Sequence, residues 1–121
     1  MKVYVTGRQG GKTAKLIQWL LEGNPIPNYP GWSHAIVCST HHQVINLSNR
    51  VRKDTEHLEG VLSERALIDL RKSIWSFNDL SSIQRGTFRN YEIAIDDADQ
   101  ILSDYFGRPP TLITMTGEIE V

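Results

Sequence analysis

Near the N-terminus, a glycine-rich stretch ends in the pair Lys12-Thr13. The apolar residues at 2–6 predict a strand, and the apolar stripe within 12–22 predicts a helix. A glycine-rich turn between a strand and a helix presents backbone N–H groups and the positive end of the helix dipole to an anion. The sequence therefore predicts a phosphate-binding loop of seven residues: Gly7, Arg8, Gln9, Gly10, Gly11, Lys12 and Thr13.

The last two residues of this loop suit a phosphate that is bound together with a metal. In the G-x-x-x-x-G-K-[ST] motif, the lysine reaches the β- and γ-phosphates of a nucleotide and the hydroxyl residue ligates Mg²⁺. Lys12 and Thr13 occupy those two positions. The registration differs from the motif, because the residue five places before Gly11 is Thr6, while Gly7 lies one place late.

Two acidic residues follow the apolar segment at 91–95, which predicts another strand. In a sheet of parallel strands, ligands bind outside the carboxyl ends of the strands. We therefore expect Asp96 to hold Mg²⁺ together with Thr13, and Asp97 to orient or deprotonate an attacking water. The alternative for Asp97 is an acid that only complements the dipole at the start of a helix.

Alternating strands and helices position these residues. Strands are predicted at 2–6, 33–39, 74–77, 91–95 and 111–116. Helices are predicted over 12–22 and after Thr40, Ser63, Asn78 and Asp96. This order predicts an α/β fold with a mostly parallel five-stranded sheet. The length of 121 residues predicts a single domain over residues 1–121.

The helix after Thr40 carries a second candidate surface. Thr40 with Gln43 three residues later forms a capping-box pattern, which predicts the start of the helix. Arg50, Arg52 and Lys53 then form a clustered basic run. Any nucleic acid bound there would be contacted through its phosphates. The alternative is an ordinary solvated helix face.

Composition excludes several classes of protein. A net charge of −1 lacks the broad basic excess of a dedicated nucleic-acid binder. The single cysteine, Cys38, cannot form an internal disulfide, and neither a membrane-spanning run nor a signal-peptide pattern is present. We therefore expect a cytoplasmic protein without a membrane partner. Cys38 with His41, His42 and His57 lacks the paired ligand spacing of a zinc site.

Four motifs resemble those of the first RecA-like ATPase lobe of superfamily 2 helicases and of phage large terminases. Arg8-Gln9-x-Gly11-Lys12-Thr13 is similar to the terminase phosphate loop, which also often deviates at its leading glycine. Ser39-Thr40 looks like the segment with which such lobes approach a nucleic-acid backbone. Residues 95–99 resemble the Asp-Glu-Ala-Asp box. Residues 114–117 resemble the segment that senses the γ-phosphate, a role that would fall to Thr114 and Thr116.

The resemblance implies a P-loop NTPase fold of the RecA-like, additional-strand class, a three-layer sandwich. It implies ATP and Mg²⁺ as ligands, with Lys12, Asp97 and Arg8 as catalytic residues, in a small ATPase of phage or mobile-element origin. The partner would be a nucleic-acid-processing or packaging protein, with DNA as a candidate ligand. The chain lacks a second lobe, so a partner or another copy would supply an arginine in trans. Asp97 stands where these families usually have glutamate.

Two other functions remain open from the residues. A nucleotide or small-molecule kinase would need an acceptor pocket and an arginine-bearing lid. Arg85, Arg89 and Arg108 could serve such a lid, but no insertion of lid length separates the predicted strands. A nucleotide-dependent switch protein would bind the nucleotide and dock on another protein without significant hydrolysis.

Overall fold

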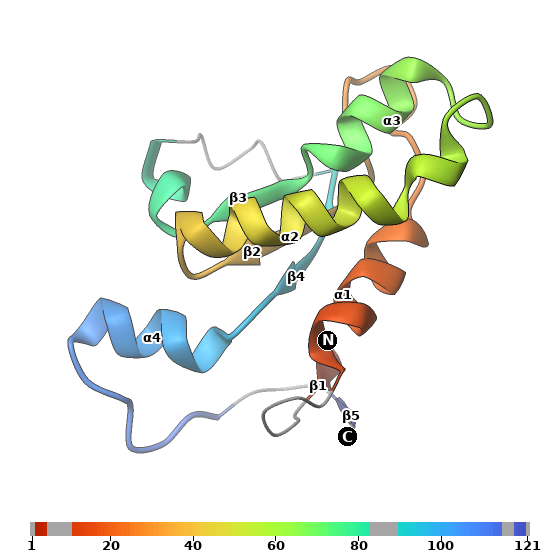
Figure 1. Ribbon diagram of the computed structural model, residues 1–121. Coiled ribbons are helices and arrows are strands. Elements are labelled where there is room, and N and C mark those ends of the chain that lie inside the picture. Colours follow the sequence, from red (N-terminus) through yellow and green to blue (C-terminus); the bar gives the residue numbers. More distant parts are fainter. Residues whose placement is uncertain (1, 5–10, 83–89, 115–117, 121) are drawn as a thin grey trace.

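The computed structural model of the chain describes residues 2–4, 11–82, 90–114 and 118–120 (Figure 1). Its strands are β1 (Lys2–Tyr4), β2 (His34–Cys38), β3 (Ile74–Ser76), β4 (Glu92–Ile95) and β5 (Glu118–Glu120). Its α-helices are α1 (Lys12–Leu21), α2 (His41–Asp54), α3 (Glu64–Arg71) and α4 (Ala98–Phe106). Two short 3-10 helices are η1 (Glu56–Leu58) and η2 (Asn78–Ser82).

The strands form two separate parallel groups. β2 lies between β3 and β4 in a three-stranded sheet, and β1 pairs with β5. The register places Ile36 opposite Ile74 on one side and opposite Ala94 on the other. The parallel direction agrees with the alternation of strands and helices. The expected five-stranded sheet within a three-layer sandwich is wrong, because the described strands do not form one continuous ladder.

The fifth strand lies later in the chain than expected. Residues 111–114 have no strand, and β5 occupies Glu118–Glu120 instead. Leu112 is 80% exposed, so burial of apolar side chains does not stabilise a strand there. The apolar run after Pro109-Pro110 predicted a strand, but residues 111–114 have no pairing partner among the described residues and no buried face. The remainder of the expected strand, residues 115–116, lies outside the described residues.

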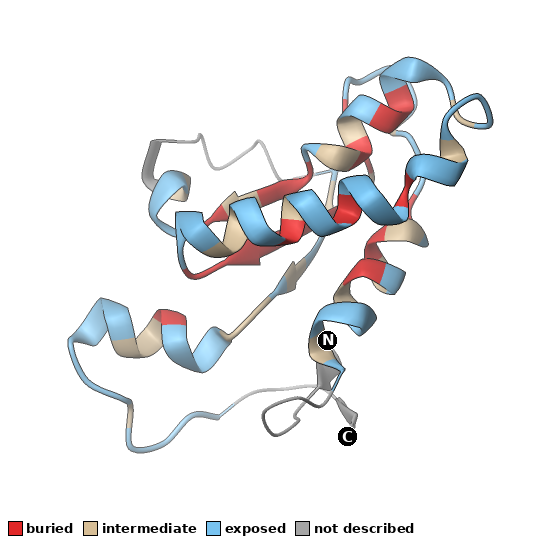
Figure 2. Cartoon of the chain, viewed as in Figure 1, coloured by how far each residue is buried: buried red, intermediate tan, exposed pale blue. Residues whose placement is uncertain are grey.

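One face of the three-stranded sheet carries the hydrophobic core. Side chains from α1, α2 and α3 pack there against β2 and β3, and buried positions gather where these elements meet (Figure 2). The core cluster consists of Ile17, Leu20, Trp32, Ile36, Cys38, Leu47, Val51, Leu67, Leu70 and Ile74. Because side chains alternate along a strand, Val37, Ile93 and Ile95 face the other side. There they line a cavity of about 500 Å³ together with residues of α4.

Most helix boundaries follow the predicted signals. The Thr40 side chain accepts from the backbone N–H of Gln43 in a complete capping box, and the Ser63 side chain caps α3. Gly107 ends α4 in the left-handed conformation, with φ 74°. The brief helix expected after Asn78 is the 3-10 helix η2. Across the described ranges, no helix is long and apolar enough to cross a membrane.

Candidate functional site

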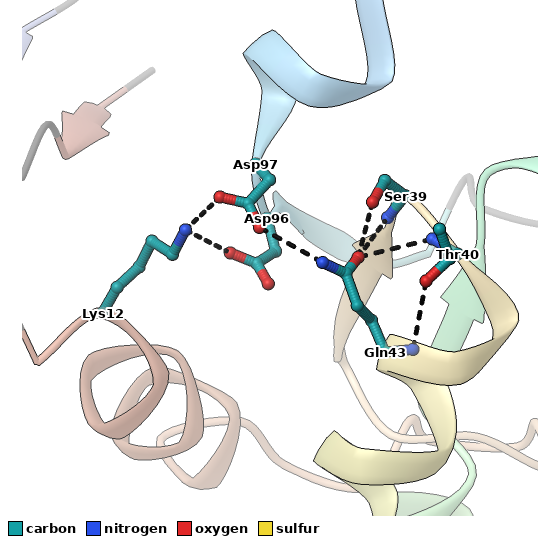
Figure 3. Close-up of polar contacts among 6 residues, drawn as sticks. All are labelled: Lys12, Ser39, Thr40, Gln43, Asp96 and Asp97. Atoms are coloured by element: carbon teal, nitrogen blue, oxygen red, sulfur yellow. Dashed lines mark hydrogen bonds and ion pairs between the residues drawn. The ribbon is translucent and has the colours of Figure 1, made fainter. Parts of the chain in front are cut away.

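Three charged residues from distant parts of the chain meet beside β4 (Figure 3). Lys12 is the first residue of α1, while Asp96 and Asp97 directly follow β4. Lys12 Nζ lies 3.5 Å from Asp96 Oδ1 and donates a hydrogen bond to Asp97 Oδ1 within an ion pair. The structure thus brings the lysine of the glycine-rich segment into contact with both acidic residues, although Lys12 and Asp97 are 85 positions apart in the sequence.

The turn after β4 aims both carboxylates at Lys12. The backbone N–H of Asp96 donates to the carbonyl oxygen of Val37 at 2.9 Å, which extends the pairing of β4 with β2 by one residue. Asp97 then adopts φ 52° and ψ 52°, a left-handed conformation that is uncommon outside glycine but better tolerated by Asp and Asn. Asp97 is the N-cap residue of α4, yet its side chain makes no capping hydrogen bond.

Asp96 is a half-buried acid, one of whose carboxylate oxygens has no hydrogen bond from the described residues. Its side chain is 14% exposed, and its buried Oδ1 accepts no hydrogen bond within the described part of the chain. Burial and the negative charge of Asp97 raise the pKa of Asp96, against the opposing influence of Lys12. A buried carboxylate oxygen without a hydrogen bond is costly in the free protein, and it suits a cation that would replace Lys12.

The charges of Asp96 and Asp97 raise the pKa values of both Lys12 and Cys38. Burial alone would lower the pKa of Lys12, but the hydrogen bond to Asp97 and the charges of both acids raise it above its usual value. Burial, followed by the charges of Asp96 and Asp97, raises the pKa of Cys38 to about 12. Cys38 therefore remains a thiol, which is neither a nucleophile nor a good metal ligand.

The carboxylates fit a magnesium ion better than a metal held by the protein alone. The described residues contain no group of three or more His, Cys, Asp or Glu side chains able to hold a metal. Mg²⁺ is commonly bound through only one or two carboxylates, with substrate phosphates and waters completing its coordination. Asp96, with one oxygen free of hydrogen bonds, and the hydroxyl of Thr13 are the residues that would hold such an ion.

Gln43 is a member of this site that the sequence indicated only as a helix cap. Its Nε2 donates to Asp97 Oδ2 at 3.4 Å, and its Oε1 accepts from the loop formed by Ser39 and Thr40. The capping-box pattern predicted the contact with the Thr40 backbone N–H, but not those with Ser39. The contact with Asp97 depends on β2 and β4 being neighbours in the sheet, an adjacency that the order of elements alone does not specify.

The other expected site residues have few described contacts. Thr13 is exposed in the first turn of α1, and Thr114 is exposed outside any strand. No hydrogen bond of the described residues joins either side chain to Asp96 or Asp97. Five expected site residues lie outside the described residues: Gly7, Arg8, Gln9, Gly10 and Thr116. Gly11 precedes α1 with φ 75°, a conformation that favours glycine.

The basic run on α2 is solvent-accessible. Arg50, Arg52 and Lys53 are exposed, and Thr40 is exposed at the start of the same helix. Arg50 Nε lies 3.8 Å from Asp54 Oδ2, one turn further along. These positions leave three cationic side chains on the outside of α2, separated along the helix from Gln43 and the Asp97 carboxylate that it contacts.

Comparison with models of protein families finds no match to the chain. No curated protein and no solved structure matches it significantly either. The resemblance to helicase and terminase lobes therefore rests on the four sequence motifs.

Proposed function

We propose that this chain binds Mg·ATP and hydrolyses it, in association with a nucleic-acid-processing or packaging partner. The supporting observation is the contact of Lys12 with Asp96 and Asp97. In a triphosphate-binding site, a lysine at the start of the helix after the glycine-rich turn and a carboxylate at the end of a neighbouring strand serve the same phosphates and metal. An ATP-dependent activity of this kind would belong in the cytoplasm.

Each residue of the cluster has a distinct proposed role. Lys12 would exchange the two carboxylates for oxygens of the β- and γ-phosphates. Asp96 and Thr13 would hold Mg²⁺, which when bound neutralises charge on the phosphate oxygens. Asp97 would accept a proton from the water whose oxygen forms the new bond to the γ-phosphorus, while the bond from phosphorus to the ADP oxygen breaks.

The exchange of partners by Lys12 is electrostatically reasonable. Lys12 is 38% exposed, so its ammonium group can reach solvent or a ligand at the surface. The three residues carry one positive and two negative charges, which leaves one excess negative charge beside the Asp96 oxygen that accepts no hydrogen bond within the described ranges. A bound divalent cation would compensate that charge once Lys12 has turned to the phosphates.

Hydrolysis by the isolated chain should be slow. An arginine finger commonly accounts for 10³- to 10⁵-fold in rate, and P-loop enzymes that are poorly assisted turn over at about 10⁻² s⁻¹ or below. Among the described residues, no arginine contacts Lys12, Asp96 or Asp97. We propose that a partner or a second copy of the chain supplies an arginine, so that turnover per molecule rises with the concentration of that protein.

Phosphate release and ATP binding, measured on the same protein, test the proposal. Release in the absence of any acceptor indicates a hydrolase. Transfer of phosphate to a nucleoside added to the assay would indicate a kinase. Tight binding of Mg·ATP without release or transfer would indicate a switch protein. Absence of binding, with and without Mg²⁺, would contradict the proposed function altogether.

A further inference from the structure

We propose that Gln43 is a positioning residue, which fixes the direction of the Asp97 carboxylate and ties it to the loop after β2. This inference rests on the proposed function, in which Asp97 accepts the proton of the attacking water. Gln43 lies in the first turn of α2, and Figure 3 shows its side-chain amide between that loop and Asp97. A residue 54 positions away in sequence thereby contacts the acid.

The orientation of the Gln43 amide is determined by its neighbours. Oε1 faces the backbone N–H of Ser39 at 3.1 Å, the Ser39 hydroxyl at 2.5 Å and the backbone N–H of Thr40 at 3.3 Å. Backbone N–H groups can only donate, so the atom that faces them must be the amide oxygen. The amide nitrogen, which can only donate, is therefore the atom directed at Asp97 Oδ2.

The two oxygens of Asp97 are divided between two partners. Oδ1 accepts from Lys12, and Oδ2 accepts from Gln43. When Lys12 turns to the phosphates, the Gln43 amide is the side-chain donor that remains on this carboxylate in the described part of the site. The Asp97 side chain is 28% exposed and makes no cap bond, so among the described residues only Lys12 and Gln43 hold this carboxylate by hydrogen bonds.

Gln43 also makes the position of Asp97 dependent on the loop after β2. The same amide group binds both the loop and the acid, and the backbone of Gln43 is held by the Thr40 hydroxyl at 3.2 Å. A displacement of this loop would therefore change the direction of the Asp97 carboxylate. Catalytic groups must be held close to their productive geometry, so such a change lowers turnover more than it lowers nucleotide affinity.

The competing explanation is that Gln43 only caps α2, and Gln43→Glu separates the two roles. Glutamate serves as well as glutamine at this position of a capping box, since its carboxylate accepts the same backbone N–H groups. It cannot donate to Asp97, and it adds a negative charge beside that acid. Gln43→Met removes both functions of the amide while keeping an unbranched side chain of similar length.

Ser63→Ala provides the matched control for a lost cap. Ser63 caps α3 by accepting from the backbone N–H of Ala66 at 3.1 Å, and it makes no described contact with Asp97 or Lys12. We expect Gln43→Met and Ser63→Ala to lower the melting temperature by similar amounts. We expect Gln43→Glu to keep the cap of α2, so that any fall in its melting temperature comes from repulsion by Asp97 and is absent in an Asp97→Asn background.

Steady-state phosphate release and Mg·ATP affinity are then measured for the full chain and its variants. Gln43→Glu and Gln43→Met should lower kcat at least tenfold with less than a threefold change in the Kd for Mg·ATP, while Ser63→Ala keeps the parental kcat. In an Asp97→Asn background, Gln43→Glu should cause no further loss of kcat, because both substitutions impair the same step, the transfer of the proton from the attacking water to Asp97.

A Gln43→Glu variant with the parental kcat would overturn the inference. A loss confined to Mg·ATP affinity, or an equal loss of kcat in Ser63→Ala, would overturn it as well. Failure of the proposed function is recognised separately, because it appears in the parent protein before any substitution. A parent without turnover contradicts that function and removes the catalytic role of Gln43 with it.

Discussion

Replacing Asp96 by asparagine should stabilise the free protein while impairing its proposed metal site. The Asp96 side chain is 14% exposed, its Oδ1 accepts no hydrogen bond among the described residues, and the negative charge of Asp97 is adjacent. Burial and that neighbouring charge both raise its pKa. Asp96→Asn keeps the size of the side chain and removes the charge. A residue retained at a cost to stability is typical of a functional site.

The expected size of the effect is a difference between two contributions. Asparagine still places a polar atom at this position, so the gain is limited to the part of the desolvation cost and of the repulsion from Asp97 that depends on the charge, about 2 kcal/mol. The attraction lost with the substitution is that of Lys12 at 3.5 Å, and because the lysine side chain is 38% exposed, this pair contributes about 1 kcal/mol at most. The free energy of unfolding should therefore rise by about 1 kcal/mol, which raises Tm by about 4 °C for a chain of this size.

Urea and thermal unfolding at neutral pH, without Mg²⁺ or nucleotide, measure this change. Asp99→Asn is the matched control, because Asp99 is exposed in the first turn of α4, where its charge complements the helix dipole. That substitution should lower stability by about 0.5 kcal/mol. A loss of stability in Asp96→Asn as large as that in Asp99→Asn would refute the reasoning.

The pH dependence gives an internal check on the same substitution. Because folding raises the pKa of Asp96, the protonated acid favours the folded state. The contribution of protonated Asp96 to stability is complete below the pKa that Asp96 has in the unfolded chain. It is lost as the pH rises through the higher pKa that Asp96 has in the folded protein. The advantage of Asp96→Asn over the parent should therefore shrink as the pH is lowered from neutrality into the acidic range.

Further substitutions at Asp97, at Gly11 and on the basic run of α2 test separate parts of the account. Asp97→Asn should preserve Mg·ATP binding but lower phosphate release about 10²-fold, the usual scale for a lost general base, and unchanged release would assign Asp97 to structure alone. Gly11→Ala should lower the free energy of unfolding by about 1 kcal/mol. The cause is backbone strain at φ 75° and not a steric clash, because a Cβ there would meet no atom within 4 Å. Gly11→Asn should cost less, because asparagine tolerates the left-handed conformation better than alanine. Replacing Arg50, Arg52 and Lys53 together by glutamine should weaken any binding of single-stranded DNA at low salt, and equal binding before and after would place the DNA elsewhere.

Local signals in the sequence predicted the elements that carry the site. The capping box at Thr40, the cap at Ser63 and the glycine at position 107 all occupy their predicted places. These signals depend on hydrogen bonds within a single turn, so neighbouring residues are sufficient to specify them. The parallel direction of the three-stranded sheet followed from the alternation of elements, and it brings Ser39 and Asp96 to the same edge.

Features that depend on distant parts of the chain could not be predicted in the same way. Residues 111–114 have the apolar composition of a strand, but a strand also requires a partner, and the described pairing of β1 is with Glu118–Glu120. The hydrogen bond from Gln43 to Asp97 requires β2 and β4 to be adjacent. The missing hydrogen bond of Asp96 becomes evident only once burial and neighbours are known.

Calorimetric titration of Mg·ATP into the parent protein and into Lys12→Ala tests the proposed nucleotide site most directly. Lys15→Ala is the control, because Lys15 is an exposed lysine one turn further along α1. We expect saturable binding by the parent and by Lys15→Ala, and a loss of affinity of at least tenfold in Lys12→Ala, since a charge-assisted contact with phosphate is removed. Equal affinity in all three proteins, or no binding by the parent, would contradict the assignment of Lys12 to a nucleotide phosphate.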